Sequence, residues 1–125
     1  MKIEELVKII DGKVMTPGVN LDREIKGGCG ADLMSDVLAS IQPDAVLLTG
    51  LCNPQVVRTA MMADVSAIVI VRGKTPPPET IKLAIDENIP LIQTPYGMFE
   101  LCGRLYRSGM PSLEKTIPDG LCECE

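Results

Sequence analysis

The stretch Ala45-Val46-Leu47-Leu48-Thr49-Gly50, at residues 45–50, decides the fold, because an uninterrupted apolar run ends there in a small polar loop. The pattern returns in Ala67-Ile68-Val69-Ile70-Val71, which leads into Arg72-Gly73, and in Pro90-Leu91-Ile92, which leads into Gln93-Thr94. Such runs, separated by helix-like segments, are typical of parallel strands that are buried on both faces. We therefore predict an α/β protein, a three-layer α/β/α domain with a mostly parallel sheet of about 4–5 strands.

The segments before and between these apolar runs have apolar residues at the spacing of a helix. Ile3, Leu6, Val7 and Ile10 follow the i, i+3, i+4, i+7 pattern of one helix face. A second helix is predicted after Asp32, a good N-cap residue, and a third from Asn53-Pro54, which reads as an N-cap followed by the first helical residue.

The glycine-rich segment Gly27-Gly28-Cys29-Gly30 does not have the glycine spacing of a dinucleotide-binding loop. It predicts a tight turn, or a strand that lies against another backbone. The functional alternative is a close approach of this backbone to a small ligand.

Composition excludes several classes of function. The chain has 125 residues and a net charge of −5, and it has no basic cluster, so we expect no nucleic-acid partner and no membrane-surface partner. No run approaches the roughly 20 apolar residues of a membrane span. The chain contains no histidine, which removes Ser-His-Asp and Cys-His catalysis and histidine metal sites. Five cysteines without a secretory leader predict reduced thiols and a cytoplasmic protein.

The periodicity ends near Met110, so we expect an α/β domain over residues 1–110 and an acidic, cysteine-containing tail over residues 111–125. Cys122 and Cys124 in the tail are weak candidates for metal ligands, because a closed site normally needs four ligands. We therefore expect no metal and no cofactor, and incidental thiols are the alternative reading of this pair.

The loops that follow parallel strands meet at one edge of a sheet, where ligands usually bind. Arg72 is the best anion partner in these loops, since a guanidinium offers bidentate hydrogen bonds. Structural alternatives stay open, because Gly50 can serve a turn, Asn53 can cap a helix and Arg72 can mark the solvated end of a strand. The predicted ligand-binding residues are Gly28, Asp32, Thr49, Gly50, Asn53, Arg72, Gly73, Thr94 and Tyr96.

Gly73-Lys74-Thr75 looks like the end of a nucleotide phosphate loop, but the rest of that motif is missing. The position that needs its first glycine is Ile68, in the middle of a predicted strand. Three prolines, Pro76-Pro77-Pro78, follow and remove backbone donors where a phosphate cradle needs them. A polar turn between strand and helix explains the segment better.

Several segments resemble the DRTGG domain family and the N-terminal domain of HPr kinase/phosphorylase, over about Ile3 to Met110. The resemblance is carried by residues 28–39, by Ile89-Pro90-Leu91-Ile92-Gln93-Thr94, by residues 98–101 and by Gly103-Arg104-Leu105-Tyr106. Leu21-Asp22-Arg23-Glu24-Ile25 and Val71-Arg72-Gly73 are also similar. The letters of the family name match Asp22-Arg23 and Thr49-Gly50, and Leu51 stands where the second glycine is expected.

This resemblance implies an HPr kinase N-terminal-domain-like α/β/α domain that dimerises and regulates, and it brings no catalytic residues. We expect a non-catalytic, ligand-sensing homodimer that binds a small anionic metabolite or nucleotide at the carboxyl edge of the strands. The alternative is an accessory protein for a redox enzyme, because stand-alone members of this type are often encoded beside iron-only hydrogenase genes. An enzyme is the weakest reading.

Overall fold

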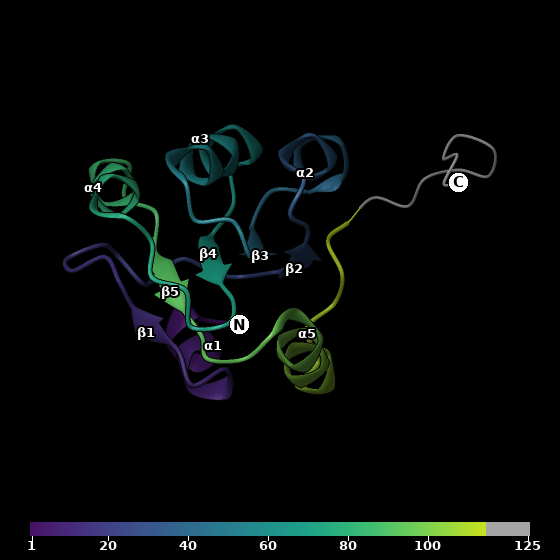
Figure 1. Ribbon diagram of the computed structural model, residues 1–125. Helices are drawn as coiled ribbons and strands as arrows, with labels where there is room; N and C mark the ends of the chain where they lie inside the picture. Colours follow the sequence, from purple (N-terminus) through teal and green to yellow (C-terminus); the bar gives the residue numbers. More distant parts are fainter. Residues whose placement is uncertain (115–125) are drawn as a thin grey trace.

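The computed structural model describes residues 1–114 and contains one five-stranded sheet, with the strand order β1-β5-β4-β3-β2 (Figure 1). Four strands are parallel to one another: β2 (Gly27–Gly30), β3 (Ala45–Thr49), β4 (Ala67–Ile70) and β5 (Leu91–Gln93). The short strand β1 (Lys13–Val14) runs antiparallel to β5 at the edge. The predicted mostly parallel sheet is confirmed.

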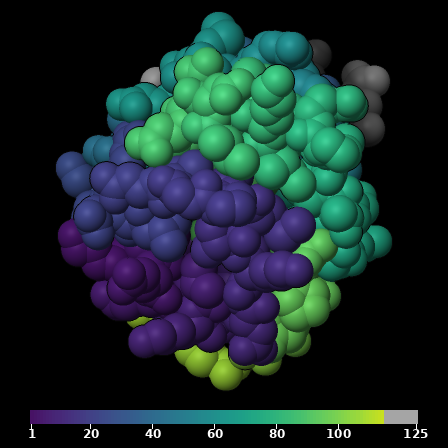
Figure 2. Space-filling view, turned by 90° about the vertical axis from the view of Figure 1, so that its left-hand side faces the viewer, coloured from purple at the N-terminus to yellow at the C-terminus, as the bar shows by residue number. Residues whose placement is uncertain are grey.

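Helices cover both faces of this sheet and make three layers (Figure 1). One face carries α2 (Met34–Ser40), α3 (Pro54–Ala63) and α4 (Pro78–Asp86), and the other carries α1 (Ile3–Ile9) and α5 (Met98–Arg107). Figure 2 shows the β1 side, where the N-terminal residues, in purple to blue, form a band below the green of α4. Within residues 1–114, no helix has the length and apolar character needed to cross a membrane.

The core is aliphatic and lies in two layers, because alternate residues of each strand point to opposite faces of the sheet. Leu47, Ile68 and Leu91 pack under α2, α3 and α4, whereas Val46 and Ile92 pack against α1 and α5. All of these side chains are fully buried. Because each buried Leu or Ile stabilises the fold by about 1.5–3 kcal/mol, the central strands are a fixed base for the loops at their ends.

The glycine-rich segment forms the edge strand β2, so the predicted strand against another backbone is confirmed and the tight turn is wrong. Gly28 donates its amide to the carbonyl of Pro111 at 2.9 Å, and its carbonyl accepts the amide of Leu113 at 2.9 Å. A Cβ on Gly27 would lie 2.6 Å from the Pro111 carbonyl oxygen. A glycine is needed at position 27 because two backbones meet there without room for a side chain.

The first residues after Met110 pair with the domain. Ser112 forms a bridge to Gly28, and Glu114 forms a bridge to Ile41. The division at residues 110 and 111 stays a prediction, and most of the predicted tail, including Cys122 and Cys124, lies outside the described residues.

Candidate functional site

The carboxyl ends of β2, β3, β4 and β5 meet at one edge of the sheet, as the parallel register requires. The loops that leave this edge are residues 31–33, 50–53, 71–77 and 94–97. Most of the predicted ligand-binding residues therefore come from neighbouring loops. Their hydrogen bonds decide which of their polar atoms are still available to a ligand.

The carboxylate of Asp32 ties the loop after β2 to the loop after β3. Its Oδ1 atom accepts the Thr49 hydroxyl at 3.0 Å and the Gly50 amide at 2.7 Å. The amide of Leu51 in turn donates to the Thr49 hydroxyl oxygen at 3.2 Å. The predicted N-cap role of Asp32 is wrong, since the N-cap position of α2 is Leu33 and the Asp32 carboxylate is bonded to this loop instead.

Lys74 joins a third loop to the same cluster. Its Nζ atom donates to the Gly50 carbonyl at 3.0 Å. An ideal Cβ on Gly50 would have Lys74 Nζ and Asp32 Oδ1 both 3.5 Å away, so these two charges flank the same glycine. The loops after β2, β3 and β4 are thus linked by one carboxylate, one hydroxyl and one ammonium group.

The turn after β4 has an unusual backbone, because Arg72 and Gly73 both have left-handed conformations, with φ of 62° and 64°. The Arg72 amide donates to the Tyr96 carbonyl at 2.8 Å, and the Gly73 amide donates to the Thr94 carbonyl at 2.8 Å. Left-handed backbone at a residue other than glycine is uncommon and persists where the surrounding structure holds it. This turn is held in place by the loop after β5.

The side chain of Gln93, the last residue of β5, also holds this turn. Its Nε2 atom donates to the carbonyls of Gly73 at 3.0 Å and Lys74 at 2.9 Å. A polar residue at the end of an apolar strand is the sequence signal for such a role, and sequence reasoning did not use it. Lys74 was missed for a similar reason, because it was considered only as part of a phosphate loop.

Thr94 is fully buried and supports the edge from inside. Its hydroxyl donates to the Ile10 carbonyl at 2.7 Å and accepts the amide of Tyr96 at 3.3 Å. Its side chain therefore positions the loop after β5, and its hydroxyl is used in hydrogen bonds within the domain.

Tyr96 is held by two residues from other elements. Its hydroxyl donates to the carboxylate of Asp11, and this hydrogen bond raises the pKa of the phenol. The Arg104 guanidinium carbon lies 4.1 Å from the centre of its ring, a cation–π contact. The predicted stacking role of Tyr96 therefore has one ring face already occupied by an intramolecular partner.

Arg72 points its side chain toward the start of α5. The Arg72 Nε atom lies 3.9 Å from the position of an ideal Cβ on Gly97, the N-cap residue of that helix. No side chain caps α5 by a hydrogen bond. Within residues 1–114, the Arg72 guanidinium takes part in none of the ion pairs.

Two predicted residues stand apart from this cluster. Asn53 is the N-cap residue of α3, as predicted, but its exposed side chain makes no capping hydrogen bond. Gly28 lies inside β2, and its backbone is paired with Pro111 and Leu113.

The Asp22-Arg23 pair lies at the opposite, amino end of the strands. Arg23 donates from Nη2 to the Asp64 carbonyl at 2.8 Å and to Asp44 Oδ1 at 3.0 Å, and from Nη1 to the Val65 carbonyl at 3.0 Å. Asp44 and Asp64 precede β3 and β4 and have left-handed backbones, with φ of 67° and 55°. Arg23 is thus a clamp on two turns and lies away from Thr49-Gly50.

Three cysteines, Cys29, Cys52 and Cys102, lie within the described residues. No group of three or more Cys, Asp or Glu side chains that could hold a metal ion occurs in residues 1–114. Burial, with a smaller contribution from the Glu114 carboxylate, raises the pKa of Cys29 to about 11. The same two causes raise the pKa of Cys102.

Comparison with known proteins identifies a family and a similar solved structure. The family model of the DRTGG domain matches residues 5–108. The chain is similar to the crystal structure of the CBS and DRTGG domains of the regulatory region of Clostridium perfringens pyrophosphatase, complexed with its activator diadenosine tetraphosphate, with a TM-score of 0.69 and 17% identity.

That alignment covers 96% of this chain and 52% of the pyrophosphatase chain, so the present chain spans about half of its length. At this identity the likeness shows the fold alone. No curated protein matches the chain. Because the family model covers residues 5–108, the chain belongs to the DRTGG domain family.

Proposed function

We propose that this chain is a non-catalytic regulatory domain that senses a small anionic metabolite or nucleotide at the carboxyl edge of its sheet. Its family membership supports a regulatory role, since the similar pyrophosphatase structure is a regulatory region complexed with a nucleotide activator. The observation that carries the proposal is the guanidinium of Arg72, which lies beside the uncapped start of α5.

Two sources of positive potential converge at this point. The first amides of a helix have no intrahelical acceptors and carry the positive end of the helix dipole. The Arg72 guanidinium adds a full charge and bidentate donors, which match a phosphate or carboxylate group. A helix N-terminus beside an arginine is a suitable place for a small anion.

The charge distribution favours one half of the edge over the other. Asp32 already accepts hydrogen bonds from Thr49 and Gly50, and its negative charge repels an anion there. We therefore place the anion between Arg72 and Gly97, with Lys74 as a second cation that can reach it by releasing the Gly50 carbonyl. Thr49, Gly73 and Thr94 support the loops, and Asn53 lies farther along the edge.

Binding at Arg72 can be transmitted to the other side of the sheet. The Arg72 amide is bonded to the loop that contains Thr94 and Tyr96. Thr94 and Tyr96 in turn contact Ile10 and Asp11 at the end of α1. These contacts connect the Arg72 turn to the end of α1, and a ligand that binds two arrangements of this turn with different affinity would act on both sides of the sheet.

The test is isothermal titration calorimetry with nucleotides, diadenosine tetraphosphate and phosphorylated metabolites. Saturable binding of at least one compound is expected, and Arg72→Ala should weaken it by about 10–100-fold, because it removes charge-assisted hydrogen bonds. Arg58→Ala is the matched control, since Arg58 is an exposed arginine on α3. Absence of saturable binding across the panel, or equal binding by the two variants, would contradict the proposal.

A cytoplasmic location and a homodimer complete the proposal. Intact mass under native conditions tests the dimer, and fractionation of host cells tests the location. The accessory-protein alternative is tested by co-purification from the host, where a stable redox-enzyme partner that persists in Arg72→Ala would favour it.

A further inference from the structure

The outward face of α5 exposes most of the aromatic surface of this protein. The chain has only three aromatic residues, and two of them, Phe99 and Tyr106, lie on this helix with 95% and 78% of their surface exposed. Exposed aromatic side chains, together with arginine, are the residue types that dominate binding energy at protein interfaces. Nothing within residues 1–114 covers them.

Gly103 lies at the centre of this face. The buried residues of α5 are Leu101 and Leu105, and the helical spacing places Gly103 on the opposite side of the helix. A Cβ at this position would meet no atom within 4 Å, so packing inside the domain does not require a glycine. A glycine weakens the middle of a helix, but on a helix surface it lets another backbone approach closely.

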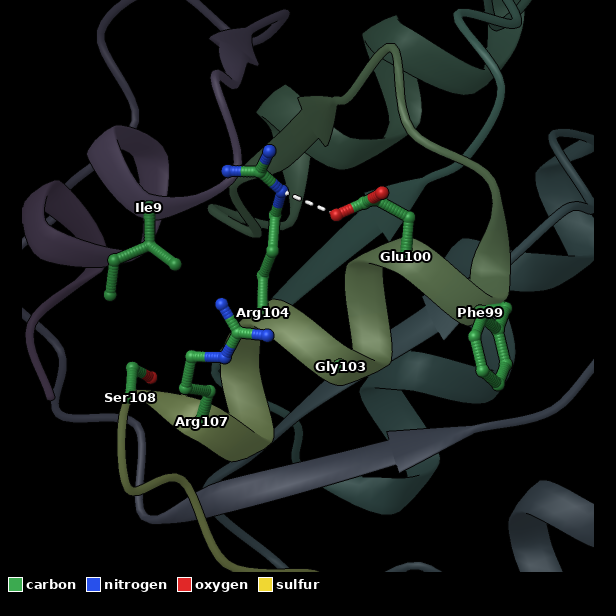
Figure 3. Close-up of a pocket in the computed structure, with 7 residues that line it drawn as sticks. All are labelled: Ile9, Phe99, Glu100, Gly103, Arg104, Arg107 and Ser108. Atoms are coloured by element: carbon green, nitrogen blue, oxygen red, sulfur yellow. Dashed lines mark hydrogen bonds and ion pairs between the residues drawn. The ribbon is translucent and has the colours of Figure 1, made fainter.

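The face is also hollowed along its length. A groove of about 640 Å³ runs beside α5, and Figure 3 shows Gly103 between Phe99 at one end and Arg107 at the other. Ile9 of α1 lines its far side, and Ser108, the C-cap residue of α5, lies at its end beside Arg107 (Figure 3). This volume is large enough to accept side chains from a second helix.

The arrangement of side chains about Gly103 is self-complementary. Phe99 and Tyr106 lie four residues before and three residues after Gly103 on one flank of the helix, and Glu100 and Arg107 lie three before and four after it on the other flank. When two such helices cross in antiparallel orientation, residues at equal distances before and after the crossing face each other. Phe99 then faces the second copy's Tyr106, and Glu100 faces the second copy's Arg107. The two members of each pair are offset along the helix axis by about one residue, a rise of about 1.5 Å.

We propose that α5 is the interface of a two-fold symmetric homodimer, in which two copies cross antiparallel at Gly103. This inference rests on the homodimer in the proposed function and names its surface. The interface is isologous, so each aromatic contact and each ion pair is formed twice. A second copy is preferred as the occupant because its reversed helix brings Tyr106 to Phe99 and Arg107 to Glu100, whose carboxylate is also ion-paired at 2.9 Å with Arg104 of its own helix.

The first test is sedimentation equilibrium of the full chain and of matched variants. Wild type is expected to be a dimer, and Phe99→Ala and Tyr106→Ala should each weaken dimerisation at least tenfold. Met62→Ala is the control, because Met62 is an apolar side chain on α3 that is 73% exposed and lies on the opposite face of the sheet. Glu100→Arg and Arg107→Glu should each weaken the dimer, and their combination should recover most of the loss.

The second test is oxidative cross-linking of Gly103→Cys, with peptide mapping to separate its disulfide from the native cysteines. A covalent dimer through residue 103 is expected, whereas Lys82→Cys, on the exposed side of α4, should give none. A monomeric wild type, a dimer unaffected by the α5 variants, or failure of the charge-reversed pair to recover would each overturn the inference. Calorimetric binding by Arg107→Glu separates the two proposals, since retained binding with a lost dimer leaves ligand sensing intact.

Discussion

Arg23→Ala is expected to destabilise the domain more than its position near the surface suggests. The side chain is 38% exposed, yet its guanidinium makes four hydrogen bonds of 2.8–3.1 Å to Val65, Asp64 and Asp44. The two bonds to backbone carbonyls are worth about 1 kcal/mol each. The two carboxylate contacts are partly screened by solvent and add up to about 1 kcal/mol in total. The variant should therefore lose roughly 2–3 kcal/mol of unfolding free energy.

The assay is urea denaturation, in which the m-values of the variant and the wild type are also compared. A change in midpoint at constant m-value reports a change in stability alone. Arg23→Lys should fall between wild type and Arg23→Ala, since an ammonium cannot reproduce the planar fork. Arg58→Ala is the control for loss of an exposed arginine. A loss below about 0.5 kcal/mol in Arg23→Ala would refute the role of Arg23 as a clamp.

The pH dependence gives an independent check on the same contact. The hydrogen bond from Arg23, with a smaller contribution from Lys26, lowers the pKa of Asp44. A carboxyl group whose pKa is lower in the folded state contributes stability above its unfolded pKa of about 3.9, and this contribution is lost as the pH falls through the folded value. The difference between wild type and Arg23→Ala should therefore be constant near neutral pH and shrink below pH ~4.

Three further outcomes follow from contacts described above. Gly27→Ala should cost about 1–3 kcal/mol in urea denaturation, because its Cβ would lie 2.6 Å from the Pro111 carbonyl oxygen; wild-type stability would contradict the close pairing. Cys29, with a pKa raised to about 11, should react with iodoacetamide at pH 8 far more slowly than the unfolded chain, as followed by peptide mass spectrometry, and equal rates would show that it is not buried. Thr94→Val should lose about 1–3 kcal/mol, because it leaves the Ile10 carbonyl without its 2.7 Å hydrogen bond, and an unchanged unfolding midpoint would exclude that role.

The sequence predicted the centre of the fold well, because buried parallel strands leave a strong pattern. The apolar runs at residues 45–49, 67–71 and 90–92 correspond to β3, β4 and β5. Strand β2 was only one of two alternatives, since glycines carry no apolar signal. The close contact of Gly27 is with the backbone of Pro111, far along the chain. That contact joins positions about 84 residues apart, which no local pattern reports.

The topology of the sheet was enough to predict which edge carries the loops. It did not predict which polar side chains at this edge are buried or already hydrogen-bonded. Asp32 looked like a helix cap because an aspartate before an apolar periodicity usually is one. Its actual partners, Thr49 and Gly50, lie 17 and 18 residues away in the chain. Thr94 looked like a polar tip of the site, and it is buried under the loop that it supports. Arg104 of α5 and Asp11 after α1 hold Tyr96, and both contacts join parts of the chain that no local pattern relates.

The pairing of residues 111–113 with β2 also protects this protein from polymerisation. An open edge strand offers its amides and carbonyls to the sheet of another molecule, and a glycine strand has no side chains to prevent such addition. Here the amide and the carbonyl of Gly28 are both taken by the chain itself. The other edge strand, β1, is only two residues long, which gives an incoming strand little to pair with. Removal of residues 111–114 would therefore create a surface for intermolecular β-sheet growth, visible as concentration-dependent aggregation.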